Sequence, residues 1–310
     1  MLFDPTGVLG QELHVSAHDI HVKVDRPDKY VALIKAENQR MVVKASLIPD
    51  SLYDRRGIDH LQPTGLPLPI VVKEVHGSPH ILVLTWIRGE KMTMMSPHDA
   101  RMEAGRALRK IHSVDPSEFF EQHQWRDRLR SSLDHELEWW LMNGGTKEAV
   151  DGVHGYLGTV WGDLKHRGHH TVLGDARGEH FLVSEGHLSG IIDMGEVWVG
   201  DPIMDFAGIA VRDPLLFFSI LEGYAPSPDE FSAILRFMPL YVLLRRLAAA
   251  HWCQLFADPK DAEIFLQPIN LENPTDWTSR TYVGDMFSKE TQAVCRRARG
   301  HWVMGAASIA

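Results

Sequence analysis

Asp175 and Asp193 are the residues whose types and spacing most clearly allow chemistry. Asp175 follows Gly174, and two short apolar runs separate it from Asp193. One carboxylate can orient an attacking hydroxyl group and accept its proton, while the other binds a divalent metal ion. Phosphoryl transfer requires little more than these two functions. The spacing therefore indicates a site that handles phosphate groups.

A β-hairpin is expected between these two carboxylates. Residues 181–183 form a brief apolar strand, residues 188–192 read as the returning strand, and the four residues 184–187, Ser-Glu-Gly-His, are typical of a turn. A hairpin brings its two outer ends close together. We therefore expect Asp175 and His180, on the entering loop, to share one small space with Asp193 at the exit.

This stretch resembles the aminoglycoside phosphotransferase and choline-kinase-like family. The family's catalytic loop reads H-G-D-x-x-x-x-N, and its metal-binding segment reads I-D-[W/F]-G-[D/E] followed by G-D-P-x-x-D. Residues 173–180 of this chain read LGDARGEH, residues 192–196 read IDMGE, and residues 200–205 read GDPIMD. The resemblance implies that ATP is the phosphoryl donor, Asp175 the catalytic base and Asp193 a ligand of Mg²⁺.

Two positions depart from the family pattern. Leu173 stands where the family has His, and an apolar residue there could preserve the fold while changing local hydrogen bonds. His180 stands where the family has the Asn that binds a second metal ion. An imidazole can ligate a metal, but it is a softer ligand than Mg²⁺ usually selects. Reduced activity, an altered metal preference and loss of activity all stay open.

The upstream sequence predicts a strand pair that ends in a lysine. Residues 20–24, 31–36 and 41–45 read as strands, and Lys44 resembles the kinase lysine that binds the α- and β-phosphates. Its acidic partner is expected on the following helix, with Asp54 preferred and Asp59 and Glu74 as alternatives. The connection between residues 24 and 31 contains no glycine, which argues against a protein kinase and leaves a small-molecule kinase open.

Residues 81–90, ILVLTWIRGE, resemble the family's hinge. The resemblance implies that main-chain groups around Thr85 and Ile87 hydrogen-bond the adenine edge. Residues 100–114 predict a helix, and His112 near its end is expected to be a hydrogen-bonded scaffold residue. Asp205, at the start of a later helix, is expected to brace the catalytic loop.

Composition limits the class of protein. The chain has 310 residues, 44% of them hydrophobic, with a balance typical of a globular protein. No signal peptide and no membrane-spanning run are predicted, and Cys253 and Cys295 do not suggest a disulfide framework. The cytoplasm is the expected location.

The negative charge is unevenly distributed. Residues 1–85 have 10 acidic and 9 basic side chains, a net charge of −1, which leaves −8 of the chain's −9 for the remainder. An acidic surface disfavours nucleic acid and suits a cationic small molecule. In the family, acidic residues line the acceptor pocket, and the candidates here follow an apolar helix expected over residues 241–256: Asp258, Asp261, Glu263, Glu272 and Asp276.

These observations predict an α+β, bilobal protein-kinase-like fold. A small antiparallel β lobe that binds nucleotide is expected over residues 1–85, and a larger, mainly helical catalytic and substrate-binding lobe over residues 86–310. The implied activity is ATP-dependent O-phosphorylation of a small hydroxylated molecule, with an aminoglycoside-type antibiotic favoured. The alternatives are a kinase of choline, a sugar or an amino alcohol, and a pseudokinase that only binds nucleotide.

Overall fold

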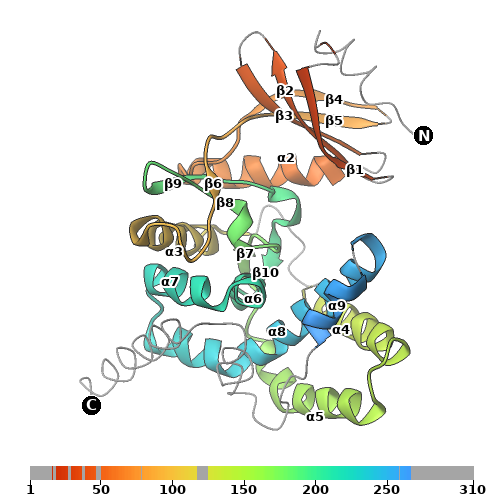
Figure 1. The fold of residues 1–310 in the computed structure, drawn as a ribbon. Helices are drawn as coiled ribbons and strands as arrows, with labels where there is room; N and C mark the ends of the chain where they lie inside the picture. Colours follow the sequence, from red (N-terminus) through yellow and green to blue (C-terminus); the bar gives the residue numbers. More distant parts are fainter. Residues whose placement is uncertain are drawn as a thin grey trace. The chain divides into compact units, whose positions relative to one another are not determined.

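The computed structural model describes residues 16, 19–26, 29–36, 39–46, 50–77, 79–116, 125–257 and 259–266. These residues form two compact units (Figure 1). The first unit comprises the described residues of 1–92 together with 179–198, and the second comprises those of 93–178 and 199–310. The division predicted at residue 85 stays a prediction. The placement of residues 179–198 with the first unit was not anticipated.

A five-stranded antiparallel sheet forms much of the first unit. Its strands, in spatial order, are β1 (Ile20–Asp25), β2 (Tyr30–Ala36), β3 (Gln39–Ser46), β5 (His80–Thr85) and β4 (Val71–Val75). Alternate residues of β2 and β3, such as Ala32, Ile34 and Val43, are buried in one core cluster. This alternation is the two-residue period of a strand with one buried face, and the strands predicted in this region are confirmed.

The first unit also contains α2 (Asp50–Leu61), the short 3-10 helices η2 (Gln62–Thr64) and η5 (Met194–Glu196), and a second sheet. The three strands of that sheet are β6 (Glu90–Lys91), β8 (Phe181–Ser184) and β9 (His187–Ile191). Strands β8 and β9 are the predicted hairpin. Glu185 and Gly186 at its turn have positive φ angles of 53° and 88°, which match the twist of the flanking strands.

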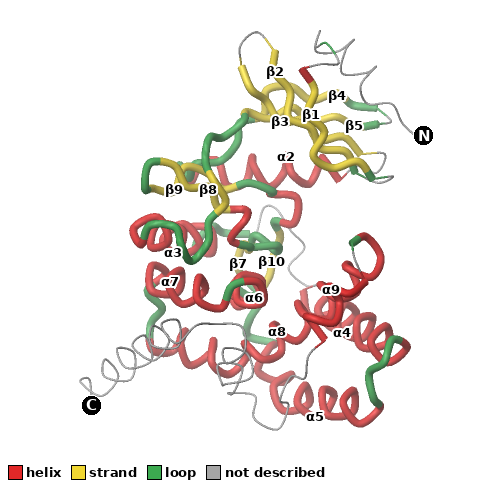
Figure 2. The backbone as a smooth tube through the Cα atoms, in the orientation of Figure 1, coloured by secondary structure: helices red, strands yellow, loops and turns green. Residues whose placement is uncertain are grey.

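The second unit is mainly helical, as predicted (Figure 2). Its helices are α3 (His98–His112), α4 (Trp125–Met142), α5 (Lys147–Leu164), α6 (Ile203–Arg212), α7 (Pro214–Tyr224), α8 (Pro228–Phe256) and α9 (Pro259–Leu266). A two-stranded sheet pairs β7 (His170–Val172) with β10 (Trp198–Gly200), and the 3-10 helix η4 (Gly178–His180) precedes β8. Helices α3 and α7 touch at glycines, because a Cβ atom at Gly105 would lie 2.1 Å from the Ile220 carbonyl oxygen.

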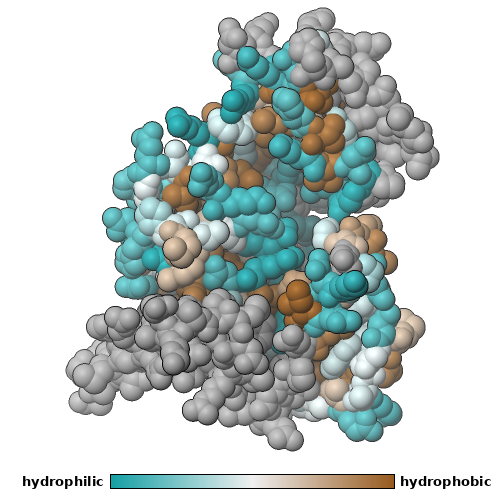
Figure 3. Space-filling view, in the orientation of Figure 1, coloured by the Kyte–Doolittle hydropathy of each residue, from teal (hydrophilic) through white to brown (hydrophobic). Residues whose placement is uncertain are grey.

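Trp125 and Trp139 belong to the core of the second unit. Trp125 on α4 stacks on Tyr241 of α8, with ring centroids 6.2 Å apart. Trp139 stacks on His251 at 4.7 Å, and both tryptophans are buried. Hydrophilic side chains predominate on the described surface in Figure 3, with smaller hydrophobic patches between them. None of the described helices combines the length and the apolar character needed to cross a bilayer.

Candidate active site

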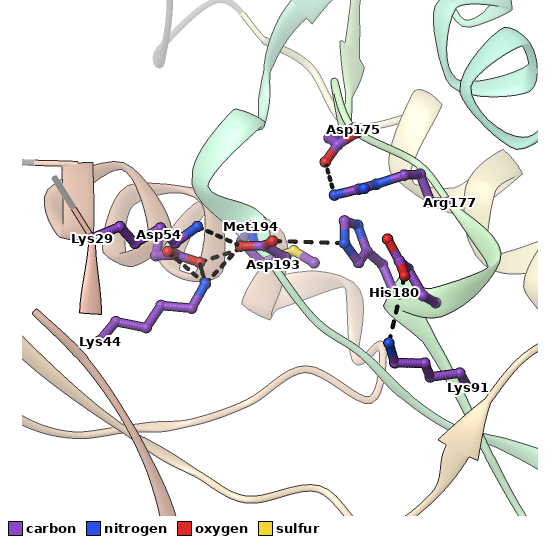
Figure 4. A network of polar contacts seen from close by, with 10 residues as sticks. Lys29, Lys44, Asp54, Lys91, Asp175, Arg177, His180, Asp193 and Met194 are labelled. Carbon is purple, nitrogen blue, oxygen red and sulfur yellow. Dashed lines mark hydrogen bonds and ion pairs between the residues drawn. The ribbon is translucent and has the colours of Figure 1, made fainter. Parts of the chain in front are cut away.

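Lys44 is the centre of an ion-pair cluster in the first unit (Figure 4). Its Nζ atom lies 2.8 Å from both carboxylate oxygens of Asp54 and 2.6 Å from Oδ1 of Asp193. Lys44 comes from β3, Asp54 from α2, and Asp193 is the second residue after β9. Two neighbouring elements and one segment far along the chain therefore meet at one ammonium group.

Asp54 is the acidic partner of Lys44, and neither alternative competes for that role. Asp59 is exposed on α2 and accepts a hydrogen bond from Arg55. Glu74 on β4 accepts hydrogen bonds from Arg55 and pairs with His80. Of the three candidates from the sequence, Asp54 is therefore the one that contacts Lys44, and its role in nucleotide binding stays a prediction.

Close packing between α2 and η5 holds the two carboxylates in place. The Met194 amide donates a hydrogen bond to Oδ1 of Asp54 at 3.0 Å, so Asp54 binds both the lysine and the backbone next to Asp193. Gly57, one helical turn later, allows this approach, since a Cβ atom there would lie 2.4 Å from the Met194 carbonyl oxygen. Asp193 itself has a φ of 65°, a left-handed conformation that is uncommon for a residue other than glycine.

Electrostatics keep the cluster ionised. Burial opposes the charged form of Lys44, but Asp54 and Asp193 outweigh this effect and raise the pKa of Lys44 above its usual range. Burial also opposes the ionisation of Asp193, yet Lys44, Lys29 and His180 together hold the pKa of Asp193 well below its usual range. Asp193 is therefore a carboxylate at neutral pH, the form that binds a cation.

Lys29 is a residue that sequence reasoning missed. Its Nζ atom lies 3.9 Å from Oδ1 of Asp193. Lys29 stands in the connection between β1 and β2, where the family resemblance directs attention to glycines instead. A basic residue in a phosphate-covering position was the available signal.

His180 and Asp193 face each other across the base of the hairpin, as expected from its two ends. The His180 Nε2 atom lies 3.6 Å from Oδ2 of Asp193, and the Ile192 amide donates to the His180 carbonyl oxygen at 2.9 Å. The Asp193 carboxylate suits Mg²⁺, whereas the imidazole of His180 suits a softer divalent ion such as Zn²⁺ better. Both residues could hold a metal ion, and Asp193 fits Mg²⁺ the better of the two.

Asp175 lies in the second unit, on the loop after β7. Its Oδ2 atom accepts a hydrogen bond from Arg177 at 2.6 Å, and its side chain is 29% exposed. A partly exposed carboxylate next to an arginine can meet a hydroxylated ligand. The chain connects Asp175 to His180 through only four residues, which limits their separation to about 18 Å.

A buried network supports the loop that contains Asp175. Asp205 on α6 is fully buried, and its two carboxylate oxygens accept hydrogen bonds from the amides of Leu173 and Gly174 at 2.8 and 2.9 Å. The Nε2 atom of His112 on α3 is hydrogen-bonded to Oδ2 of Asp205 at 3.0 Å. The bracing role expected for Asp205 and the scaffold role expected for His112 are confirmed. Leu173 is itself buried, in keeping with an apolar replacement.

A second buried carboxylate anchors the preceding loop. Oδ1 of Asp201 accepts a hydrogen bond from Nη2 of Arg167 at 2.7 Å, and Oδ2 accepts one from the Tyr241 hydroxyl group at 3.0 Å. In the basic loop of residues 165–170, the side chains of Lys165, His166, His169 and His170 are exposed. Arg167 is partly buried because it pairs with Asp201, and the sequence offered no sign of this partner.

The hinge residues have distinct environments. The Thr85 amide donates to the Ile70 carbonyl oxygen at 2.9 Å, so it is not available to a nucleotide. The Ile87 side chain packs against Gly190 of β9, where a Cβ atom would lie 2.6 Å from Cγ2 of Ile87. Main-chain binding of adenine at Thr85 would therefore have to use its carbonyl group, and the roles of both residues stay predictions.

The acidic residues proposed for the acceptor pocket are only partly described. Asp261 and Glu263 are exposed on α9. Asp258, Glu272 and Asp276 lie outside the described residues. Their contribution to substrate binding stays a prediction.

Comparison with known proteins decides the family. The model of the phosphotransferase enzyme family matches residues 28–233, about two thirds of the chain, including both the Lys44 cluster and the Asp175 loop. The chain belongs to the phosphotransferase enzyme family. No curated protein matches it.

Solved phosphotransferases share its kinase-like fold. A thermostable mutant of aminoglycoside phosphotransferase APH(4)-Ia is 18% identical, with a TM-score of 0.65 over 90% of this chain and 99% of that one. Macrolide 2'-phosphotransferase MphH from Brachybacterium faecium is 18% identical, with a TM-score of 0.61 over 86% and 98%. Spectinomycin phosphotransferase APH(9)-Ia, in complex with ADP and spectinomycin, is 14% identical, with a TM-score of 0.59 over 95% and 97%. At such identities the likeness establishes the fold.

Proposed function

We propose that this phosphotransferase transfers the γ-phosphoryl group of ATP to a hydroxyl group of a small molecule. The observation that supports this most directly is the Lys44 cluster, in which one buried ammonium group joins Asp54 and Asp193. A purely structural ion pair between Lys44 and Asp54 would not require a second, partly exposed acid such as Asp193. A triphosphate, by contrast, needs both a cation and a metal-binding carboxylate.

Each residue has one task in the proposed reaction. Lys44, oriented by Asp54, binds the α- and β-phosphates, and the Ile87 amide and the Thr85 carbonyl group contact adenine. Asp193 and His180 hold Mg²⁺, which when bound neutralises charge on the phosphate oxygens. Asp175 orients the acceptor hydroxyl and takes its proton. The acceptor oxygen forms a bond to the γ-phosphorus, the bond to the bridging oxygen breaks, and ADP leaves.

A cationic acceptor fits the charge of the chain. The residues after 85 have a net charge of −8, and an acidic surface attracts a polycation. Aminoglycoside-type antibiotics have this charge and several hydroxyl groups, so we favour them. Use of ATP suggests that the protein acts in the cytoplasm. A kinase of choline, a sugar or an amino alcohol is the nearest alternative, because the residues that handle phosphate do not select the acceptor.

His180 favours a second candidate, a nucleotide-binding protein without turnover. Its imidazole is a poor ligand for Mg²⁺, and one weak metal site could slow transfer severely. A His180→Asn variant separates the two. Activity that appears only in the variant would identify the natural chain as a pseudokinase.

The test combines binding with turnover. The full chain should show a higher midpoint of thermal unfolding with ATP plus Mg²⁺ or Mn²⁺, and should convert ATP to ADP with at least one aminoglycoside or amino alcohol of a panel. An Asp175→Asn variant should lose about 10³-fold or more in kcat and keep its nucleotide affinity. Absence of both stabilisation and turnover would contradict the proposal, and turnover retained by Asp175→Asn would remove Asp175 as the base.

A further inference from the structure

A second group of metal-ligating side chains lies on the hairpin that joins β4 to β5, outside the residues used in the proposed reaction. Glu74 lies on β4, His76 is the first residue after β4, and His80 is the first residue of β5. We propose that these three side chains form a binding site for a divalent transition-metal ion, with zinc as the best-fitting ion.

The distances suit a single small ion. The His80 Nε2 atom lies 2.9 Å and the His76 Nδ1 atom 3.7 Å from the same oxygen, Oε1 of Glu74. One ligand atom from each residue lies within 4.8 Å of the other two. Ligand atoms around a tetrahedral zinc ion are separated by about 3.3 Å, given bonds of about 2.0 Å. A small rotation of the His76 ring is therefore enough to bring three ligands onto one ion.

The second carboxylate oxygen of Glu74 is already held. The Nη1 atom of Arg55 donates a hydrogen bond to Oε2 of Glu74 at 3.1 Å, and its Nε atom donates one to Oδ2 of Asp59 at 2.6 Å. This contact orients the glutamate and leaves Oε1 directed at the histidines, as outer partners of metal ligands commonly do. Glu74 and Asp59 together have a charge of −2, and Arg55 contributes +1. The remaining net charge of −1 favours binding of a cation.

Burial and access also agree with a metal site. The side chains of His80 and Glu74 are 6% and 13% exposed, whereas that of His76 is 75% exposed. The ion would thus have a fixed inner side and an open outer side for entry and for a bound water. Two imidazoles and one carboxylate favour zinc over Mg²⁺, which prefers oxygen ligands.

Another triad, His135, Glu136 and His251, serves as the internal comparison. Its members also lie within 4.8 Å of one another, but Glu136 and His251 form a helix-to-helix hydrogen bond of 3.1 Å. His135 and Glu136 are neighbours on α4, and adjacent helical residues point in different directions. The hairpin group is preferred because the Arg55 guanidinium orients its glutamate, whereas the His251 ring is held by stacking on Trp139.

Zinc affinity of the full chain tests the proposal without reference to phosphoryl transfer. Competition with a chromophoric zinc indicator should reveal a site that excess Mg²⁺ does not block. His76→Ala, a change at an exposed side chain that should not disturb folding, should weaken this site at least tenfold. His98→Ala is the matched control, because His98 is an exposed histidine beside Asp99 and Glu222 that belongs to none of the groups of three close ligand atoms among the described residues. It should leave the affinity unchanged.

Two further measurements make the assignment decisive. Co²⁺ bound to the wild-type chain should give the visible absorption of a tetrahedral site, and His76→Ala should abolish it. Zinc should raise the midpoint of thermal unfolding of the wild type and not that of His76→Ala. Unaltered zinc affinity in His76→Ala, or loss of the site in His135→Ala instead, would overturn the proposal.

Discussion

At the scale of single residues, Lys44 determines what the first unit can do. Its ammonium group binds Asp54 and Asp193, and only 11% of its side chain is exposed. The family resemblance pointed to this lysine and to Asp54 ahead of Asp59 and Glu74, and their roles stay predictions. The contact of Arg167 with Asp201 could not be predicted, since no local pattern reports a contact between distant segments.

A pH dependence follows from the Lys44 cluster. The depressed pKa of Asp193 contributes stability that is present above about pH 4 and is lost as the pH falls further. The raised pKa of Lys44 contributes stability that is present below about pH 10 and is lost above it. Lys44→Met should therefore lower the free energy of unfolding by about 3 kcal/mol between pH 5 and 9. The deficit should shrink at either extreme.

Urea unfolding followed across pH measures this deficit. Lys147→Met provides a control, because Lys147 is exposed and its partner Asp151 lies on the same helix, so no measurable change is expected. A deficit that grows below pH 4 would show that Asp193 is not the acid stabilised by Lys44.

The buried carboxylate of Asp205 gives a second prediction at this scale. Asp205→Ala would leave the amides of Leu173 and Gly174 and one nitrogen of His112 without their partner. We expect a loss of about 3 kcal/mol in the free energy of unfolding and a large loss of kcat. His112→Asn should cost less, because both backbone hydrogen bonds remain. Chemical denaturation and steady-state kinetics measure the two effects, and equal losses in both variants would contradict this ranking.

At the scale of elements, the strands and the hairpin were predictable because their two-residue period and turn residues are local. The strands over residues 31–36 and 41–45 appear as β2 and β3, and the hairpin after His180 appears as β8 and β9. The packing of α2 on η5 was not predictable. A glycine at position 57, inside a helix, lowers helix stability in a sequence-based view. The close approach of Met194 explains why a residue without a side chain stands there.

This packing predicts a large effect from one methyl group. Gly57→Ala should push η5 away from α2, separate Asp54 from the Met194 amide and cost about 1 to 3 kcal/mol of stability, despite the better helix propensity of alanine. Gly155→Ala on α5 has open space around it and should be neutral or stabilising. Thermal unfolding and nucleotide affinity of the two variants give the comparison. A Gly57→Ala protein with wild-type affinity would disprove this coupling.

At the scale of the whole molecule, the charge count predicted an acidic part after residue 85, and the family resemblance predicted a small β part and a larger, mainly helical part. They did not predict that residues 179–198 fold with the first 92 residues, because no composition change marks those boundaries. The kinase-like α+β fold itself followed from the family resemblance and is confirmed by the family match and the solved relatives.

The overall charge predicts the salt response of the proposed reaction. If the acidic surface attracts a polycationic acceptor, the KM for that acceptor should rise several-fold as the ionic strength increases from about 0.05 to 0.5 M. The KM for an uncharged hydroxylated acceptor should change little over the same range. Initial-rate measurements with the two acceptors make the comparison, and equal responses would show that long-range charge does not select the substrate.

The first unit is built from two stretches of chain, residues 1–92 and 179–198. This discontinuity affects how the protein can be divided into fragments. A fragment that stops at Met92 would lack β8, the neighbour of β6, and the η5 backbone on which Gly57 rests. Such a fragment would expose apolar side chains and aggregate. Expression of the first unit as an independent protein would require a gene that fuses residues 179–198 to residues 1–92.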